Sequence, residues 1–241
     1  MTEISPQALD ELAPQGLLRA AINYGNPVLA QKAEDGSPQG VSVALAKALA
    51  EELGVRLELI IFDAAGKVFG ALDQGVWNIA FLAIEPVRAE QIAFSEPYVI
   101  IEGTYLVATD SPYAHVDDLD QPGLKLAVGK GAAYDLFLSR TLKHAQLERA
   151  ETSAGAVDLY FAQSIDAAAG VRQPLQKVAD SNPQYRVLDS TFTSIRQAMA
   201  VPKPCTAGAA YVGDFIQRKK AEGFVGAELV ASGQLDVTVA P

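Results

Sequence analysis

The sequence predicts an α/β protein of two lobes, each with a mixed, mostly parallel sheet flanked by helices. Strand and helix patterns alternate from the start of the chain, which is typical of α/β folds. The run NIAFLAI at 78–84 is apolar throughout, as expected of a strand covered on both faces. Two long β-type runs, 99–110 and 195–203, enclose further strand and helix patterns. A strand that outruns its own sheet often crosses between lobes, so these runs predict two crossings.

The first part of the chain supplies strands and helices in turn. LLRAAI at 17–22 is typical of a short buried strand. Apolar residues then recur at helical spacing from Val41 to Leu53, and Gly54 supplies a stop signal. VRLELIIF at 55–62 predicts a second strand, and Val68 with Leu72 indicates a short helix after it.

The strand–helix pattern starts again after the first long run. LKLAVGKGAAYD at 124–135 predicts a strand, a glycine turn and a helix. A helix and a strand follow within 156–171, YRVLDS at 185–190 is a further strand, and the segment 207–223 predicts a helix. We therefore expect a discontinuous lobe 1 and an inserted lobe 2, with the bounds 1–104 and 197–241 for lobe 1 and 105–196 for lobe 2.

Composition excludes several classes of function. About half of the 241 residues are apolar and a fifth are charged, which is typical of a soluble globular protein. A net charge of −10 disfavours nucleic acid and anionic membranes as partners. Cys205 is the single cysteine, and His115 and His144 have no acids at ligand spacing, so we expect no metal, no cofactor and no catalytic histidine. No apolar run is long enough to span a bilayer.

The beginning of the sequence leaves the cellular compartment open. MTEISPQALDELAPQG has neither the basic nor the apolar region of a signal peptide. A cytoplasmic protein and a mature secreted form both fit this pattern.

The segment AIEPVRAEQIAFSEPY at 83–98 contains the strongest candidate for a ligand contact. Pro86 favours the first turn of a helix, which puts Arg88 near the positive end of that helix. A cation there is unfavourable unless an anion lies beside it, and the planar guanidinium fork suits a carboxylate. The alternative is a surface ion pair with Glu85 or Glu90, worth about 0–1 kcal/mol.

The same segment resembles the one that marks bacterial extracellular solute-binding proteins of family 3, the polar amino-acid receptors of ABC importers. The resemblance covers nearly the whole chain. The matching segments are LRAAINYGNPV, GVSVALAKALAEELG, GALDQGVWNIAF, LAVGKGAAYD and AMAVPK. It implies a type II periplasmic-binding-protein fold, in which two lobes on a two-strand hinge close over a ligand. It also implies a monomer in the periplasm with an ABC permease as partner, and it matches Arg88 to the arginine that binds the ligand α-carboxylate.

The chain departs from the pattern of amino-acid binders at several positions. Ala83 stands where Ser or Thr is usual, five residues before the arginine. The family's GTT at the start of the lobe 2 helix is Gly131, Ala132 and Ala133 here, which keeps the backbone N–H groups but loses the hydroxyls. The Asp that usually holds the ligand α-ammonium aligns with Val171. The resemblance therefore implies that the carboxylate site is kept and the ammonium site is lost or moved.

Four further residues complete the expected ligand-binding set. Glu85 is the nearby acid expected to accept the ligand ammonium in place of the missing Asp; the alternative is that it caps the helix. Arg172, next to Val171, pairs with a second carboxylate or lines the hinge. Asn23 and Asn26 lie in the opening loop, where an acid and an aromatic residue are common in the family.

The expected function is capture of a small carboxylate-bearing solute, amino-acid-like or an organic acid, in the cleft between the lobes. We expect no catalytic residue. Two alternatives stay open: an enzyme similar to cyclohexadienyl dehydratase, with Glu85 as its general acid, and a stand-alone cytoplasmic solute sensor.

Overall fold

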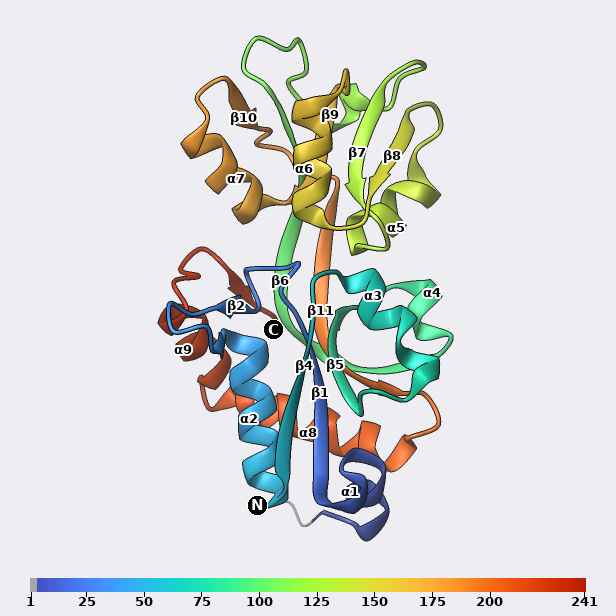
Figure 1. Cartoon of the computed structure of the whole chain (residues 1–241), viewed down its shortest axis with the longest axis vertical. Coiled ribbons are helices and arrows are strands. Elements are labelled where there is room, and N and C mark those ends of the chain that lie inside the picture. The colour runs from blue at the N-terminus through green and yellow to red at the C-terminus, as the bar shows by residue number, and fades with distance from the viewer. Residues whose placement is uncertain (1–3) are drawn as a thin grey trace. The chain divides into compact units, whose positions relative to one another are not determined.

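The structure, a computed structural model, describes residues 4–241 and divides the chain into two compact units. Unit 1 ends at Ile100 and resumes at Arg196, and unit 2 is Ile101–Ile195. The two strands that carry the chain from one unit to the other are β6 (Ile92–Ala108) and β11 (Thr193–Pro202), which we call the connecting strands (Figure 1).

In unit 1, the ten-stranded sheet formed within residues 4–241 has the order β4-β1-β5-β11, and β6 follows β11. The first four of these strands are β4 (Arg56–Phe62), β1 (Leu17–Asn23), β5 (Ile79–Ala83) and the connecting strand β11. β1 runs parallel to β4 and β5, whereas β11 is antiparallel to β5, so this sheet is mixed. Every residue of β5 is buried, which explains why the sequence shows an unbroken apolar run there.

The two longest helices of unit 1 begin and end close to the positions that the sequence predicts, whereas the helices at 6–12 and 224–231 were not predicted. α2 (Val41–Leu53) ends at Gly54, whose φ of +66° is a left-handed conformation that glycine adopts without strain. It packs on β1 and β4. The indole N–H of Trp77 donates to the carbonyl oxygen of Val68 in α3 at 3.0 Å, which anchors that helix in the core. The other elements are α1 (Pro6–Leu12), η1 (Pro14–Gly16), β2 (Gln31–Lys32), β3 (Pro38–Gln39), α3 (Ala65–Gly70), η2 (Leu72–Gln74), α4 (Pro86–Ala89), α8 (Thr206–Ala221), α9 (Phe224–Ala231) and β12 (Thr238–Val239).

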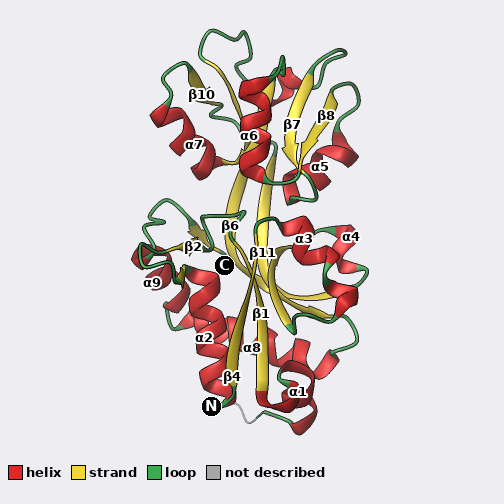
Figure 2. Cartoon of the chain, viewed as in Figure 1, coloured by secondary structure: helices red, strands yellow, loops and turns green. Residues whose placement is uncertain are grey.

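Unit 2 contains the remaining strands of the ten-stranded sheet (Figure 2) and a buried cluster of its own. The strand order is β8-β7-β9-β6-β10, with β7 parallel to β8 and β9 and with β6 antiparallel to β9 and β10. Leu106, Ala127, Tyr160, Ala168 and Leu175 belong to one buried cluster. The elements are η3 (Val116–Leu119), β7 (Lys125–Gly129), α5 (Ala133–Thr141), β8 (Gln146–Ala150), α6 (Ser153–Ala162), β9 (Ala167–Val171), α7 (Arg172–Ser181) and β10 (Tyr185–Val187).

Candidate functional site

The loops that follow β1 and β5 hold most of the candidate residues of unit 1. These strands are parallel neighbours, so the loops after them leave the same edge of the sheet, where α/β proteins bind ligands. The loop after β1 contains Asn23 and Asn26, and the turn after β5 contains Ala83, Glu85 and Arg88.

Arg88 is a buried cation in the four-residue helix α4. Its side chain is only 1 % exposed, and its Nη1 donates to the carbonyl oxygen of Ala83 at 3.0 Å. Pro86 occupies the first turn of α4, as the sequence predicts, and Glu85 is the extended residue before the helix. The exposed surface ion pair considered as an alternative therefore does not describe Arg88.

The charge of Arg88 is balanced from within unit 1. Burial lowers the pKa of the Arg88 guanidinium to about 10, and the negative charge of Glu85 opposes that shift. Glu85 itself is buried. Because a buried cation requires an anionic or strongly polar partner, Glu85 and Arg88 form a pair of opposite charges just beyond the end of β5. Arg88 stays protonated at neutral pH.

The two asparagines of the β1 loop shape the backbone of that loop. The Oδ1 atom of Asn23 accepts from the N–H of Gly25 at 2.9 Å, and that of Asn26 accepts from Val28 at 3.3 Å. Gly25 lies so close to the next loop that a Cβ on it would be 2.4 Å from the carbonyl oxygen of Asp63. The asparagine side chains therefore fix a tight turn, and any ligand contact would be made from this turn.

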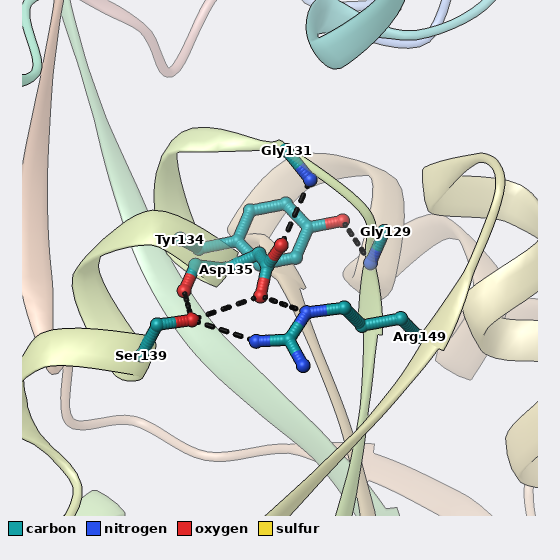
Figure 3. Close-up of polar contacts among 6 residues, drawn as sticks. All are labelled: Gly129, Gly131, Tyr134, Asp135, Ser139 and Arg149. Carbon is teal, nitrogen blue, oxygen red and sulfur yellow. Dashed lines mark hydrogen bonds and ion pairs between the residues drawn. The ribbon is translucent and has the colours of Figure 1, made fainter. Parts of the chain in front are cut away.

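The buried carboxylate of Asp135 fixes the unit 2 loop that carries Gly131, Ala132 and Ala133 (Figure 3). The N–H of Gly131, whose φ is +70°, donates to Oδ2 of Asp135 at 2.8 Å. Ala132 is the residue before α5, and Ala133 begins that helix. Since Asp135 occupies the Gly131 N–H, the loop's capacity to bind an anion lies in the first turn of α5 rather than at Gly131.

Asp135 is itself fixed by two side chains. Its Oδ1 accepts from Nε of Arg149 at 3.0 Å and from the hydroxyl of Ser139 at 3.2 Å, and Nη2 of Arg149 donates to the same hydroxyl at 2.8 Å (Figure 3). Asp135 and its partners were not predicted from the sequence. The available signal was an acid at the third position of a helix that follows a glycine turn, where a carboxylate commonly caps a loop N–H.

Tyr134 adds a second set of contacts to this loop. Its hydroxyl donates to Ser153 Oγ at 2.8 Å and accepts from the N–H of Gly129 at 3.3 Å. Burial raises the pKa of the Tyr134 hydroxyl. The phenol is therefore a neutral structural group at physiological pH.

Arg172 is the first residue of α7, and its guanidinium contacts protein oxygens. Nε lies 2.6 Å from Oε2 of Glu102, Nη1 donates to the carbonyl of Leu188 at 2.9 Å, and Nη2 donates to that of Asp189 at 2.9 Å. All of these residues belong to unit 2. The arrangement favours a structural role over the second ligand contact expected from the sequence.

Two kinds of feature are absent from residues 4–241. No group of His, Cys, Asp and Glu side chains in this part of the chain has the arrangement of a metal site. Among the same residues, no helix is both long and apolar enough to cross a bilayer.

Comparison with known proteins identifies the family. The model of bacterial extracellular solute-binding proteins, family 3, matches residues 18–227. The chain belongs to this family. It is therefore a solute-binding protein, and the predicted two-lobe α/β fold with mostly parallel sheets and flanking helices is confirmed.

Individual relatives are distant in sequence. A glutamine-binding protein of Geobacillus stearothermophilus is 25 % identical over 80 % of this chain and 75 % of its own length. A cyclohexadienyl dehydratase of Pseudomonas aeruginosa is 27 % identical over 58 % of this chain and 53 % of its own length. The structure of an amino-acid ABC transporter substrate-binding protein from Streptococcus pneumoniae, bound to L-arginine, superposes with a TM-score of 0.80 at 24 % identity, covering 97 % of this chain and 99 % of that one.

Proposed function

We propose that this protein is the substrate-binding component of an ABC importer and that it captures a small carboxylate-bearing solute. The observation that carries the proposal is Arg88, a buried cation that directly follows the fully buried strand β5. The sequence resemblance matches Arg88 to the family arginine that binds the ligand α-carboxylate, which supports the proposal. Membership of a solute-binding family and the likeness to amino-acid transporter components support this assignment.

Arg88 is the proposed anchor for the ligand carboxylate. In the structure, its guanidinium contacts the carbonyl of Ala83 and its charge is balanced by Glu85. We propose that an incoming carboxylate takes over from Glu85, because a guanidinium fork forms two parallel hydrogen bonds to such a group. The further proposed ligand contacts are Asn23, Asn26, Ala83, Glu85, Ala132 and Ala133, whereas the N–H of Gly131 is taken by Asp135.

The proposed ligand is a mono- or dicarboxylate, or a compound whose amine lies away from the α-carbon. An α-ammonium removed from water needs an anionic acceptor, and without one the cost is several kcal/mol. Val171 and Ala83 offer no side-chain acceptor. The charge of Glu85 already acts on Arg88, so using Glu85 for an ammonium would weaken the support for the buried guanidinium.

The proposed partner is an ABC permease, to which the protein would deliver its solute. The proposed location is the periplasm. The protein is proposed to act as a monomer. An uptake assay tests the partnership: deletion of the gene should abolish import of the ligand, and reintroduction of the wild-type gene should restore it. Full uptake without the protein would contradict the assignment.

A lyase activity is the second candidate, favoured by the similarity to cyclohexadienyl dehydratase over 148 residues. Aromatisation of a cyclohexadienyl acid releases the ring carboxylate as CO2 and the ring hydroxyl as water, and a general acid protonates the leaving hydroxyl. Glu85 is the buried acid that the candidate site offers. Purified protein incubated with a cyclohexadienyl acid should then produce an aromatic product that absorbs in the near ultraviolet. We favour binding because Glu85 also serves as the countercharge of Arg88.

A thermal-shift panel of amino acids, keto acids and dicarboxylates tests the ligand class directly. A ligand at about 100 times its dissociation constant adds about 2.7 kcal/mol to the free energy of unfolding. At least one carboxylate without an α-amino group is expected to raise the melting temperature. Arg88→Met in the same assay should abolish that shift. Stabilisation by uncharged sugars alone would refute the proposed carboxylate site.

A further inference from the structure

The segment that leads into β11 is bound along the other connecting strand, β6, inside unit 2. The N–H of Leu188 donates to the carbonyl of Tyr105 at 3.0 Å, and the N–H of Phe192 donates to that of Gly103 at 3.0 Å. Gly103 permits this close approach, because a Cβ at that position would be 2.7 Å from the ring of Phe192. The chain is therefore fixed on β6 immediately before it leaves unit 2 at Ile195.

A buried hydroxyl bridges the same two segments. The side chain of Thr104, on β6, is fully buried. Its Oγ1 is 3.1 Å from the carbonyl oxygen of Leu188 and 2.8 Å from that of Ser190. The one hydroxyl proton of Thr104 is thus shared between two carbonyl oxygens. Both oxygens can therefore accept a further hydrogen bond from a stronger donor.

Arg172 is that stronger donor. Its Nη1 donates to Leu188 at 2.9 Å, and its Nη2 is 2.9 Å from the carbonyl oxygen of Asp189 and 3.3 Å from that of Ser190. Its Nε lies 2.6 Å from the carboxylate of Glu102, which is on β6. One guanidinium therefore spans from β6 to the segment that leads into β11.

The geometry uses the whole guanidinium fork and not only its charge. The Glu102 side chain is about half exposed, so the ion pair alone contributes little. Two different nitrogens of the planar guanidinium donate to the backbone carbonyls, and a lysine ammonium cannot reproduce this arrangement. We infer that Arg172 is a positioning residue that couples β6 to the segment leading into β11, and that it thereby limits the range of arrangements of the two units in the ligand-free protein.

The inference rests on the proposed function in one respect, the effect of the coupling on ligand binding. If the protein binds a solute, a narrower range of ligand-free arrangements changes the apparent affinity for that solute. The coupling itself is measured without any ligand. Its failure is therefore distinguishable from a failure of the proposed ligand class.

Distance measurements between spin labels test the inference. The labels go on Lys47→Cys in unit 1 and Lys177→Cys in unit 2, both exposed helix positions, in a Cys205→Ser background. Arg172→Met is expected to broaden the distance distribution of the ligand-free protein or to shift its mean. Hydrogen exchange at the amides of Leu188 and Phe192 should also quicken by about tenfold, because their local opening becomes easier.

Arg186 provides a matched control in the same unit. Its guanidinium also contacts backbone carbonyls, those of Thr109, Ser111 and Tyr113, but these belong to the loop after β6 and not to the segment that leads into β11. Arg186→Met should leave the distance distribution as in the parent protein even if it lowers the melting temperature. An equal change in both variants would show a general loss of stability and overturn the inference.

Two further variants decide between charge and geometry and cover the case in which Arg172→Met does not fold. Arg172→Lys should behave like Arg172→Met, and parent-like behaviour would refute a role for the fork. Glu102→Gln removes one end of the bridge at a partly exposed position and should shift the distribution in the same direction. An unchanged distribution in Glu102→Gln would contradict the coupling.

Discussion

Nη1 of Arg88 donates to the carbonyl oxygen of Ala83, five residues earlier in the chain, at 3.0 Å. The guanidinium therefore folds back onto the last residue of β5, and the turn between them holds Glu85 as a buried countercharge. An ordinary surface arginine makes no such contact. This geometry links the stability of the β5–α4 turn to the proposed binding of an anion.

Replacing Arg88 by methionine should remove the proposed carboxylate anchor. We expect the affinity for the carboxylate found in the ligand panel to fall by at least about 2 kcal/mol, because a charged hydrogen-bond donor is lost. Isothermal calorimetry measures this change. Breaking a buried pair costs about 3–5 kcal/mol of stability, so Arg88→Met combined with Glu85→Gln should recover part of the folding loss but none of the affinity. Unchanged affinity in a folded Arg88→Met variant would contradict the anchor.

Asp135→Asn should destabilise unit 2. The amide keeps the shape of the carboxylate but loses its charge, and it turns a donor toward either the Gly131 N–H or Arg149. Since a buried charged group loses its partner, we expect a loss of about 3 kcal/mol in the free energy of unfolding. Urea denaturation measures this loss. The control is Glu148→Gln, whose half-exposed pair with Lys125 at 3.5 Å should contribute less than about 1 kcal/mol.

The contact between α2 and α8 should make stability depend on pH in the acid range. Glu52 accepts from Arg218 at 2.6 and 2.9 Å and from the hydroxyl of Tyr211 at 2.6 Å. The Arg218 hydrogen bonds are the main cause of the lowered pKa of Glu52, and burial opposes them. Because the folded pKa lies below the unfolded one, this stabilisation is fully present above the unfolded pKa of about 4.3. It is lost as pH falls through the lower folded pKa.

Melting temperatures recorded from pH 7 to pH 3 test this dependence. Glu52→Gln should lower the melting temperature at pH 7 and flatten its decline toward pH 3. Glu51→Gln changes an exposed neighbour on the same helix and should keep the parent's profile. A parallel decline for the parent and Glu52→Gln would exclude Glu52 as a source of the acid sensitivity.

Ligand binding should compact the protein if the two units close on the solute about the connecting strands. Small-angle scattering at a saturating ligand concentration should give a smaller radius of gyration than the ligand-free protein, since hinge closure is a common response of two-unit binding proteins. The Arg88→Met variant, mixed with the same ligand, serves as the control and should not compact. Identical radii with and without bound ligand would argue against closure.

Strong local patterns in the sequence predicted most of the fold. The all-apolar run at 78–84 and the helical spacing from Val41 to Leu53, ended by Gly54, reflect burial and a left-handed stop that few residues allow. β6 begins earlier than expected, at Ile92, because the polar residues within 94–97 mask the strand pattern. The two-residue strands β2 and β3 leave too few residues for any period to be visible.

The candidate site was less predictable than the fold because its partners are distant in sequence. The sequence indicated that Arg88 would lie at a helix start, but its burial depends on packing. Arg172 was expected to contact a ligand or line the hinge, yet its nearest oxygens come from Glu102 and Leu188, residues 70 and 16 positions away. Such contacts depend on the pairing of β6 with β9, which no local pattern records.

The protein should discriminate against ordinary polar α-amino acids such as histidine, arginine and glutamine. Val171 and Ala132 provide no side-chain acceptor for an α-ammonium, and an unpaired ammonium costs several kcal/mol when it leaves water. Glu85 is the residue that could supply the missing acceptor, but its charge is already set against the Arg88 guanidinium. Calorimetric titration of these amino acids beside matched carboxylates without the amine should therefore show binding of the latter alone. Glu85→Gln sharpens the test: an amine-free carboxylate should bind more tightly, since it no longer competes with Glu85 for Arg88. Micromolar binding of several polar amino acids by the parent, lost in Glu85→Gln, would instead make Glu85 the ammonium site and overturn the proposed ligand class.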